Sequence, residues 1–471
     1  MNTNPLLCTD VYKLGHMEFY KPGTTKIYSY LEARSDKKFS HTVFFGLQYY
    51  LKQFLSKPVT KEQAEEFFDY RMRILGGVPE GVRTKINALV ELGYIPLKIK
   101  AVPEGLRINN RNVLMTVTNT HPDFYWCVGF FESLLLKVWN TCTVATYSYE
   151  LRQLFTDYCE KTGGIPELIP FQVHDFGYRG CSSEETAALS GMAHLTSFLG
   201  TDTVPAVKCA RDFYSAAEPV GLSVPASEHS VMCSFGFEDE IEAFRHMLKV
   251  NPTGIVSIVS DTYNLWNVLD NFAVALKDEI LSRQGKVVFR PDSGEPEKIL
   301  LGGRMADHEP WTDGVFDRLA DVFGSTLNDK GYRSLHPNVG AIYGDGMYDK
   351  RIRSILAEMD AAGYCSSNLV IGVGGLLLQQ HNRDDLGFAF KATHAVINGH
   401  EVELFKDPIT DPGKRSKKGL MSLWKTNTGT YFTTDCTSAE DEKEGLLSPV
   451  YENGMLLVNH KFADIRKRLW A

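Results

Sequence analysis

The chain has 471 residues, of which 43% are apolar and 23% are charged, and it carries a formal net charge of −8. This composition is that of an ordinary globular protein and excludes collagen-like and low-complexity chains. A mildly acidic chain also argues against bulk binding of nucleic acid, although it is compatible with a local basic patch.

The cysteines and the N-terminal residues indicate the compartment. The nine cysteines form no C-x-x-C pair and no zinc-binding spacing, so we expect free thiols in a reducing environment. The first residues lack the basic and apolar regions of a signal peptide, and no apolar run is long enough to span a bilayer. We therefore expect a cytoplasmic protein that binds neither membrane nor nucleic acid.

The first 145 residues are expected to form strands beside an apolar helix. Strand-like patterns occur over residues 24–34, 95–105 and 112–120, and a helix is predicted over Tyr125–Trp139. This part of the chain therefore favours a β-rich, mostly antiparallel arrangement.

Residues 146–387 have a different pattern. Short apolar runs end in polar, glycine-rich turns and lead into helix candidates, and the unit recurs about seven times, which predicts a parallel α/β sheet or a β/α barrel. Such nearly continuous apolar runs are typical of buried parallel strands. The turns that follow the strands would meet on one face and form one pocket. Helices are predicted over Ser183–Thr196, Asp239–Lys249 and Tyr348–Ala362.

Residues 388–471 return to strand patterns, and we expect them to join residues 1–145 in a discontinuous flanking domain. The predicted fold class is therefore α/β: an irregular β/α barrel over residues 146–387 with a flanking β-rich α+β domain. Within the C-terminal part, Lys406–Gly419 is a basic loop interrupted by proline and glycine. Its composition fits binding of phosphate or pyrophosphate, a localisation signal or a solvated face.

Two glycine turns, Gly344–Gly346 and Gly372–Gly375, are candidate phosphate loops. Glycines between a strand and a helix let backbone N–H groups approach an anion, and the helix N-terminus adds partial positive charge. Neither turn is a Walker or dinucleotide motif, and each alone fits an ordinary tight turn. Two such loops on one predicted face favour a phosphorylated ligand.

Charged residues stand at equivalent strand ends. In the RPDSG segment, Arg290 is expected to bind phosphate oxygens and Asp292 to bind ribose hydroxyls or Mg²⁺. The alternative is a salt bridge between the two that shapes the loop. Together with Asp261 and Asp345, Asp292 favours a Mg²⁺ ion shared with a substrate phosphate over a metal held by protein ligands alone.

Three further residues have both functional and structural interpretations. His229 is a candidate general base, metal ligand or phosphate acceptor, or a structural histidine. Phe176 offers a face on which a planar heteroaromatic ligand could stack, or it belongs to the core. Asp202 either accepts a hydrogen bond from a ligand amide or caps the helix that follows it.

The ordered set of motifs resembles that of the nicotinamide phosphoribosyltransferases, a family of type II phosphoribosyltransferases. The resemblance extends from about Leu6 to Gly419, which is nearly the whole chain. The set is specific, although each motif alone is weak. The motifs are, in chain order, LLCTDVYKLGH, HDFGYRG, GTDT, SVPASEHS, VSDTYN, RPDSG, GDG, GVGGLLLQ, NRDDLGFAFK and KDPITDPGKRSKKG.

The resemblance implies a homodimer with active sites at the subunit interface. The implied enzyme makes nicotinamide mononucleotide and pyrophosphate from nicotinamide and phosphoribosyl pyrophosphate, in NAD salvage. Phe176 would stack on one face of the nicotinamide ring and the partner subunit's Tyr12 on the other. Asp202 would accept the carboxamide N–H, and His229 would be phosphorylated by ATP, which couples ATP hydrolysis to turnover.

The resemblance also implies roles for the remaining site residues. Arg179, Ser223, Val224 and Ser257 would surround the base. Asp261, Arg290 and Asp292 would hold ribose hydroxyls, phosphates and Mg²⁺. Gly344, Asp345, Gly374 and Gly375 would hold the ribose and its 5′-phosphate. Positive charge for phosphate and pyrophosphate would come from Arg34, Arg383, Lys391, Lys406 and Lys414.

Two other functions are compatible with the sequence. A nicotinate phosphoribosyltransferase is the nearest alternative, but the carboxylate of nicotinate would be repelled by Asp202. A non-catalytic protein that binds a metabolite or acts in signalling is the other, and the complete set of charged strand-end residues argues against it.

Overall fold

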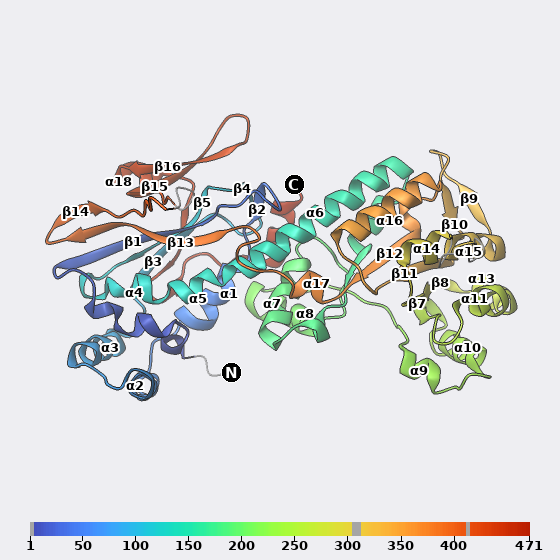
Figure 1. Cartoon of the computed structure of the whole chain (residues 1–471), viewed down its shortest axis with the longest axis horizontal. Coiled ribbons are helices and arrows are strands. Elements are labelled where there is room, and N and C mark those ends of the chain that lie inside the picture. Colours follow the sequence, from blue (N-terminus) through green and yellow to red (C-terminus); the bar gives the residue numbers. More distant parts are fainter. Residues whose placement is uncertain (1–3, 304–311, 411–414) are drawn as a thin grey trace. The chain divides into compact units, whose positions relative to one another are not determined.

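The computed structural model describes residues 4–303, 312–410 and 415–471. The chain forms two compact units (Figure 1). The expected domain division at residues 145/146 and 387/388 stays a prediction. The first unit comprises Met1–Thr146, Cys209–Ala217 and His381–Ala471, and the second comprises Tyr147–Lys208 and Glu218–Gln380.

The first unit is built on a seven-stranded antiparallel sheet that takes strands from both ends of the chain. Strand β1 lies between β13 and β5, so that Ala33 pairs with Phe388. The predicted β-rich flanking part is thereby confirmed. In spatial order the strands are β14 (His400–Glu403), β13 (Phe388–Ile397), β1 (Thr24–Ala33), β5 (Val113–Asn119), β3 (Leu97–Ala101), β17 (Ser448–Glu452) and β18 (Met455–Leu456).

Helices and a hairpin flank this sheet. Figure 1 shows α2, α3, α4 and α5 on one side of it and the hairpin of β15 and β16, with helix α18, on the other. Helix α2 begins at a capping box, in which Thr60 and Gln63 each bond the other's backbone N–H. The elements are α2 (Lys61–Leu75), α3 (Glu80–Leu92), α4 (Trp126–Phe130), α5 (Glu132–Leu136), β15 (Leu420–Lys425), β16 (Tyr431–Thr437), α18 (Ala439–Glu444) and the C-terminal α19 (Phe462–Leu469).

A buried carboxylate attaches the segment Cys209–Ala217 to the first unit. Glu104 is 2% exposed and accepts hydrogen bonds from the backbone N–H groups of Gly46 at 2.9 Å and Gln48 at 2.7 Å. The hydroxyl of Tyr214 donates to the same carboxylate at 2.9 Å. This segment lies within the residues expected for the barrel, yet its contacts place it with the flanking sheet.

The second unit contains a parallel sheet of five strands. Three of its strands, β6, β11 and β12, are short and almost fully buried, as the continuous apolar runs predict, whereas β7 and β8 begin with exposed residues and are buried toward their carboxyl ends. In spatial order they are β6 (Val173–Asp175), β12 (Leu369–Val373), β11 (Val339–Tyr343), β8 (Gln284–Arg290) and β7 (Thr253–Val259).

Two short segments close this sheet into a ring. They connect the edge strands β6 and β7 through single parallel bridges rather than through full strands. The predicted irregular β/α barrel is therefore confirmed, and the irregularity lies at this closure. The bridging pairs are Asp175–Thr201, Gly200–Leu222 and Ala226–Ser257.

Helices accompany the barrel strands. The three predicted helices are present as α7, α10 and α16, with ends that differ by one or two residues from the prediction. Among the described residues, no helix is both long and apolar enough to cross a lipid bilayer. The helices are α6 (Val138–Thr162), α7 (Glu184–His194), α8 (Val204–Tyr214), α9 (His229–Cys233), α10 (Glu240–Val250), α13 (Lys277–Leu281), α14 (Pro296–Leu301), α15 (Val315–Phe323), α16 (Asp349–Ala361) and α17 (Gly375–Leu378).

Candidate active site

The carboxylates that follow β7 and β8 lie side by side. The backbone N–H of Asp292 donates to Asp261 Oδ2 at 2.9 Å, and Ser293 Oγ donates to the same oxygen at 2.5 Å. Burial raises the pKa of Asp292, whereas the neighbouring Arg290 lowers it. Asp261 Oδ1 is buried and has no hydrogen-bond partner in the described part of the chain, so it is available to a ligand.

His229 faces both carboxylates. It is the first residue of α9, and its Nε2 lies 3.9 Å from Asp261 Oδ1 and 3.9 Å from Asp292 Oδ2. Its Nδ1 lies 3.2 Å from Thr262 Oγ1. The side chain is 48% exposed, so a ligand from solution can reach it. The structure thus brings together three residues that the sequence places after different strands.

Arg290 connects these carboxylates to an aromatic ring. Its Nη2 lies 3.3 Å from Asp292 Oδ2, so the salt bridge that the sequence allows is present. Its guanidinium carbon lies 5.2 Å from the centre of the Phe176 ring, within the range of a cation–π contact. The charged centre and the expected stacking platform are therefore adjacent.

Phe176 borders a cavity of about 390 Å³ inside the barrel. Ser223 Oγ donates a hydrogen bond to Asp202 Oδ1 at 2.5 Å, which orients that carboxylate. Arg179, by contrast, is exposed on the turn Tyr178–Gly180, outside the lining of this cavity. The predicted site residues that line the cavity are Phe176, Asp202, Ser223, Val224, Ser257 and Arg290.

Glycines of the two predicted phosphate loops make room for the Phe176 ring. A Cβ added to Gly372 would lie 2.1 Å from Phe176 Cε2, and one added to Gly344 would lie 3.2 Å from the same ring. At these two positions the glycine therefore serves the packing of the ring. Gly374 and Gly375 leave more space, since an added Cβ would meet no atom nearer than 3.9 Å and 3.4 Å, respectively.

The residues predicted to bind the ribose and its phosphate lie in the turns that follow strands β11 and β12. Asp345 is exposed directly after β11, and Gly375 is the first residue of α17, which follows β12. Their backbone positions are compatible with an anion at the carboxyl ends of the strands. Their roles in holding the ribose and its phosphate stay predictions.

Asp175 holds together the backbone segments that carry Phe176 and Asp202, and the sequence analysis does not single it out. Its side chain is fully buried, and its carboxylate accepts the Gly177 N–H at 2.7 Å and the Thr201 hydroxyl at 3.0 Å. Its own carbonyl accepts the Asp202 N–H at 2.9 Å. Burial raises the pKa of Asp175, and these hydrogen bonds oppose that effect. The sequence signal that could have identified Asp175 is its position as an acidic residue at the end of an apolar run.

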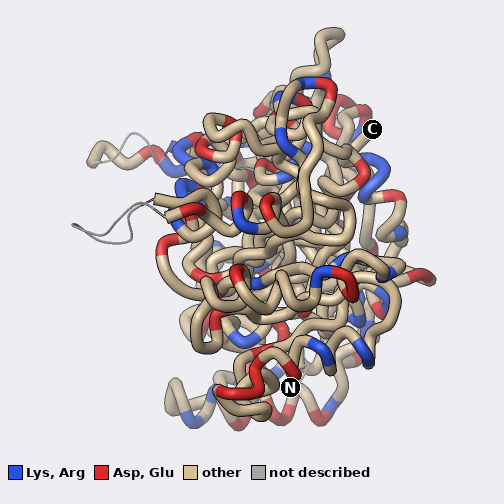
Figure 2. Tube along the Cα trace, turned by 90° about the vertical axis from the view of Figure 1, so that its right-hand side faces the viewer, with Lys and Arg blue, Asp and Glu red and all other residues tan. Residues whose placement is uncertain are grey.

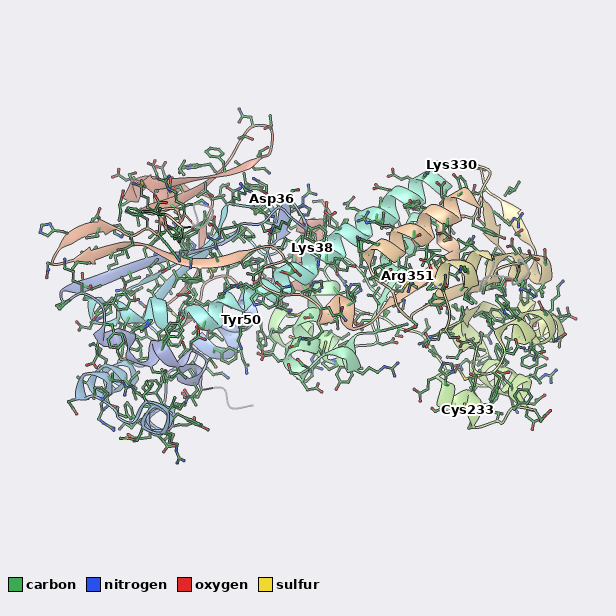
Figure 3. All side chains as sticks on the ribbon, in the orientation of Figure 1. Asp36, Lys38, Tyr50, Cys233, Lys330 and Arg351 are labelled. Carbon is green, nitrogen blue, oxygen red and sulfur yellow. The ribbon has the colours of Figure 1, made fainter. Side chains whose placement is uncertain are left out.

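Arg351 stabilises the Gly344–Gly346 turn, and the sequence analysis does not name it as a site residue either. It projects from α16 (Figure 3), and its Nη1 donates to the carbonyl of Gly346 at 3.1 Å. Its Nε lies 3.5 Å from Glu297 Oε1. The arginine therefore fixes the turn that follows β11.

Four of the predicted phosphate-binding cations interact within the first unit. Burial lowers the pKa of Lys391 most, and the positive charges of Arg34, Lys406 and Arg383 lower it further, whereas Glu132 raises it. Figure 2 shows Lys and Arg interspersed with Asp and Glu along the trace, as the mixed charges of the sequence lead one to expect. Such a group of cations fits a phosphate or pyrophosphate ligand.

Tyr12 also belongs to the first unit, whereas Lys414 lies outside the described residues. Tyr12 is 62% exposed on the helical turn Val11–Glu18. The neighbouring Lys13 forms an ion pair with Glu132 at 3.0 Å. The position of Tyr12 against a nicotinamide ring bound in the partner subunit stays a prediction.

The chain is similar in sequence to known phosphoribosyltransferases. The family described as nicotinate phosphoribosyltransferase (NAPRTase) matches residues 171–454, and the nicotinamide phosphoribosyltransferase N-terminal domain matches residues 4–73. The chain is 42% identical to a nicotinamide phosphoribosyltransferase from Acinetobacter baylyi, over 99% of this chain and 97% of that protein. It is 38% identical to one from Xanthomonas campestris, over 98% and 97%.

A solved structure shares the fold. The crystal structure of nicotinate-nucleotide pyrophosphorylase from Pyrococcus furiosus aligns with a TM-score of 0.61 at 15% identity, and the alignment covers 99% of this chain and 95% of that one.

Proposed function

We propose that this chain, which belongs to the nicotinate phosphoribosyltransferase (NAPRTase) family, transfers phosphoribosyl from phosphoribosyl pyrophosphate to nicotinamide and releases nicotinamide mononucleotide and pyrophosphate. The observation that carries the choice of base is the position of Asp202 beside Phe176 in the barrel cavity. A carboxylate accepts an amide N–H and repels a carboxylate. The names of the similar bacterial proteins support the same choice.

The reaction requires positioning more than a protein nucleophile. The base nitrogen attacks the anomeric carbon while the bond to pyrophosphate breaks, through a state with oxocarbenium character. Phe176 would hold the base by stacking and Asp202 by its hydrogen bond. Positioning of two substrates can contribute roughly 7–11 kcal/mol. Cations near the leaving group stabilise the developing negative charge, and Arg290 and the cluster around Lys391 are the proposed donors.

The carboxylate pair fits a Mg²⁺ ion whose other ligands are substrate phosphates. Asp261 Oδ1 accepts no hydrogen bond from any residue that the structure describes, and Asp292 lies directly beside Asp261. In the described residues no group of three or more His, Cys, Asp or Glu side chains is arranged to hold a metal ion, so the proposed ion would take its remaining ligands from the substrate and water. When bound, Mg²⁺ would neutralise charge on the pyrophosphate.

His229 is the proposed acceptor of the γ-phosphoryl group of ATP. Its half-exposed imidazole and its two carboxylate neighbours support this role. A ring nitrogen would form the N–P bond as the P–O bond to ADP breaks, and water would later take the phosphoryl group. Hydrolysis of ATP would in this way be coupled to turnover.

A comparison of nicotinamide and nicotinate tests the choice of base. We expect kcat/KM to favour nicotinamide, and we expect Asp202→Asn to reduce that preference by about 10-fold or more, since one charged hydrogen bond contributes roughly 1.5–3 kcal/mol. A wild-type preference for nicotinate would replace this proposal with a nicotinate phosphoribosyltransferase. Failure to release pyrophosphate from either base would favour a non-catalytic protein.

His229→Ala tests the ATP coupling separately. We expect this variant to lose the stimulation by ATP and to incorporate no label from γ-labelled ATP, while part of the basal transfer persists. The matched control is His246→Ala, which changes a histidine on α10 outside the carboxylate pair. Normal stimulation by ATP in His229→Ala would refute the phosphoacceptor role.

A further inference from the structure

A lysine at one end of the barrel cavity has no counter-charge. Lys286 lines the cavity, and its Nζ forms no hydrogen bond or ion pair with any residue that the structure describes. Burial lowers the pKa of Lys286, because a partly desolvated ammonium is disfavoured. An ammonium in this position gains most from an anion that binds beside it.

The position of Lys286 separates it from the proposed catalytic centre. Side chains alternate along a strand, so Lys286, Val288 and Arg290 of β8 all face the cavity. Because a strand rises by about 3.3 Å per residue, the Cα atoms of Lys286 and Arg290, four positions apart, are separated by about 13 Å. Lys286 therefore lies toward the amino ends of the strands, whereas Arg290 lies at their carboxyl ends.

The sequence around Lys286 accommodates its side chain. The neighbouring strand β11 has a glycine at position 340, where an added Cβ would lie 3.4 Å from Lys286 Cδ and 3.8 Å from its Nζ. The stem of the lysine thus lies against open backbone.

The remaining lining defines the chemistry of an occupant. The lining of the cavity as a whole is mainly apolar and includes Leu168, Phe171, Ile255 and Val370, with Gln172, Ser367 and Asn368 among its polar members. Asp202 is the one carboxylate among the described lining residues, and it belongs to the base pocket. A single ammonium in an apolar channel suits a monoanion, since a doubly charged phosphate would retain an uncompensated charge.

We propose that the Lys286 end of the cavity is a second ligand subsite, which binds the carboxylate of a small apolar monocarboxylic acid whose hydrocarbon part extends along the cavity toward Phe176. A molecule bound in this way would approach the base pocket, so it would compete with the base and not with phosphoribosyl pyrophosphate. The subsite would make the enzyme sensitive to acids of this class.

Calorimetric titration of the full chain at neutral pH tests the subsite without requiring turnover. The probe is octanoate, and octanamide is its neutral counterpart. We expect octanoate to bind at least about 10-fold more tightly than octanamide, as one additional ion pair in a partly buried site would produce. Equal binding of the two probes, or no binding of octanoate, would overturn the proposal.

Variants assign the preference to one residue. We expect Lys286→Met, which keeps an unbranched stem against Gly340, to abolish the preference for octanoate, and Lys286→Arg to retain it. The matched control is Lys298→Met, on α14 and outside the cavity lining, which is expected to bind as the wild type does. A preference that survives in Lys286→Met would place the carboxylate elsewhere and refute the subsite.

Competition tests the direction of the hydrocarbon chain. We expect bound octanoate to weaken nicotinamide binding in the same titration. If octanoate binds through Lys286 without affecting nicotinamide, the proposed placement toward Phe176 is wrong. If nicotinamide does not bind at all, the proposed function fails while the preference for octanoate remains measurable.

Discussion

Asp175 illustrates how a residue without an expected ligand contact can set the geometry of two residues that have one. Its carboxylate holds the turn that carries Phe176, through Gly177, and the segment that carries Asp202, through Thr201. Because the side chain is fully buried, an unmatched donor or acceptor created there would not be compensated by water. The separation of the ring from the Asp202 carboxylate therefore depends on Asp175.

Asp175→Asn is expected to weaken base binding more than chemistry. The amide has one acceptor oxygen where the carboxylate has two, so either the Gly177 N–H or the Thr201 hydroxyl loses its partner. We expect a nicotinamide KM raised about 10-fold with a smaller change in kcat, and a loss of roughly 1–3 kcal/mol in unfolding free energy. Steady-state kinetics and urea denaturation measure the two effects.

The matched control for this variant is Asp278→Asn, which changes an exposed aspartate on α13. Loss of stability without a change in the nicotinamide KM would show that Asp175 supports the fold but does not position the base.

The sequence predicts residues at the site better than residues around it. Strand-end motifs locate His229, Asp261 and Asp292, because each stands directly after an apolar run, and the structure brings the three together. Asp175 stands at a strand end as well, but its burial and its bond to Thr201 are visible only in the fold. Arg351 lies within a helix, and no strand-end motif marks its contact with Gly346.

At the scale of elements, strand β12 and the Phe176 turn depend on each other. Gly372 lies within this strand, and the Phe176 ring occupies the space that a side chain there would need. From the sequence, these glycines are interpreted as positions where backbone N–H groups approach a phosphate. The sequence does not reveal that Gly372 and Gly344 accommodate the ring of Phe176, which follows strand β6. That distinction requires the packing of the sheet.

Gly372→Ala is expected to displace the Phe176 ring, because the new methyl would lie 2.1 Å from Cε2. The displacement should raise the nicotinamide KM about 10-fold or more, in line with the cost of overpacking, about 1–3 kcal/mol. Gly77→Ala is the matched control, since an added Cβ there meets no atom within 4 Å. An unchanged KM for Gly372→Ala would show that the ring does not support the base.

At the scale of the whole molecule, the predicted site residues divide between the two compact units. The residues of the carboxylate pair and the base pocket belong to the barrel, whereas Tyr12 and the cations around Lys391 belong to the other unit. The sequence predicts the barrel from its repeated pattern. It does not predict that Cys209–Ala217 leaves it, because the tether is Glu104, a buried residue about a hundred positions away.

Mixing two inactive variants tests the proposed homodimer with shared sites. If Tyr12 completes the site of the partner subunit, Tyr12→Ala and Asp292→Asn should complement each other, since a mixed dimer contains one intact site. Random re-association of equal amounts should restore about one quarter of wild-type activity in a symmetric dimer. Each variant mixed with itself is the control, and no recovery in the heteromeric mixture would place both residues in the same subunit's site.

The closure of the barrel has a consequence for how base specificity can change. Asp202 and Ser223 stand next to the single bridges that join β6 to β7, and not on the five-stranded sheet. The sheet instead supplies the strand ends that precede Asp261, Asp292 and Asp345. In the proposed function, recognition of the carboxamide by Asp202 would thus depend on the closing segments, whereas Phe176 and the phosphoribosyl contacts would depend on the sheet. We therefore expect substitutions in the closing segments to change the preference for the acceptor base while the sheet that precedes Asp261, Asp292 and Asp345 persists, which makes the closure a starting point for redesign toward other bases.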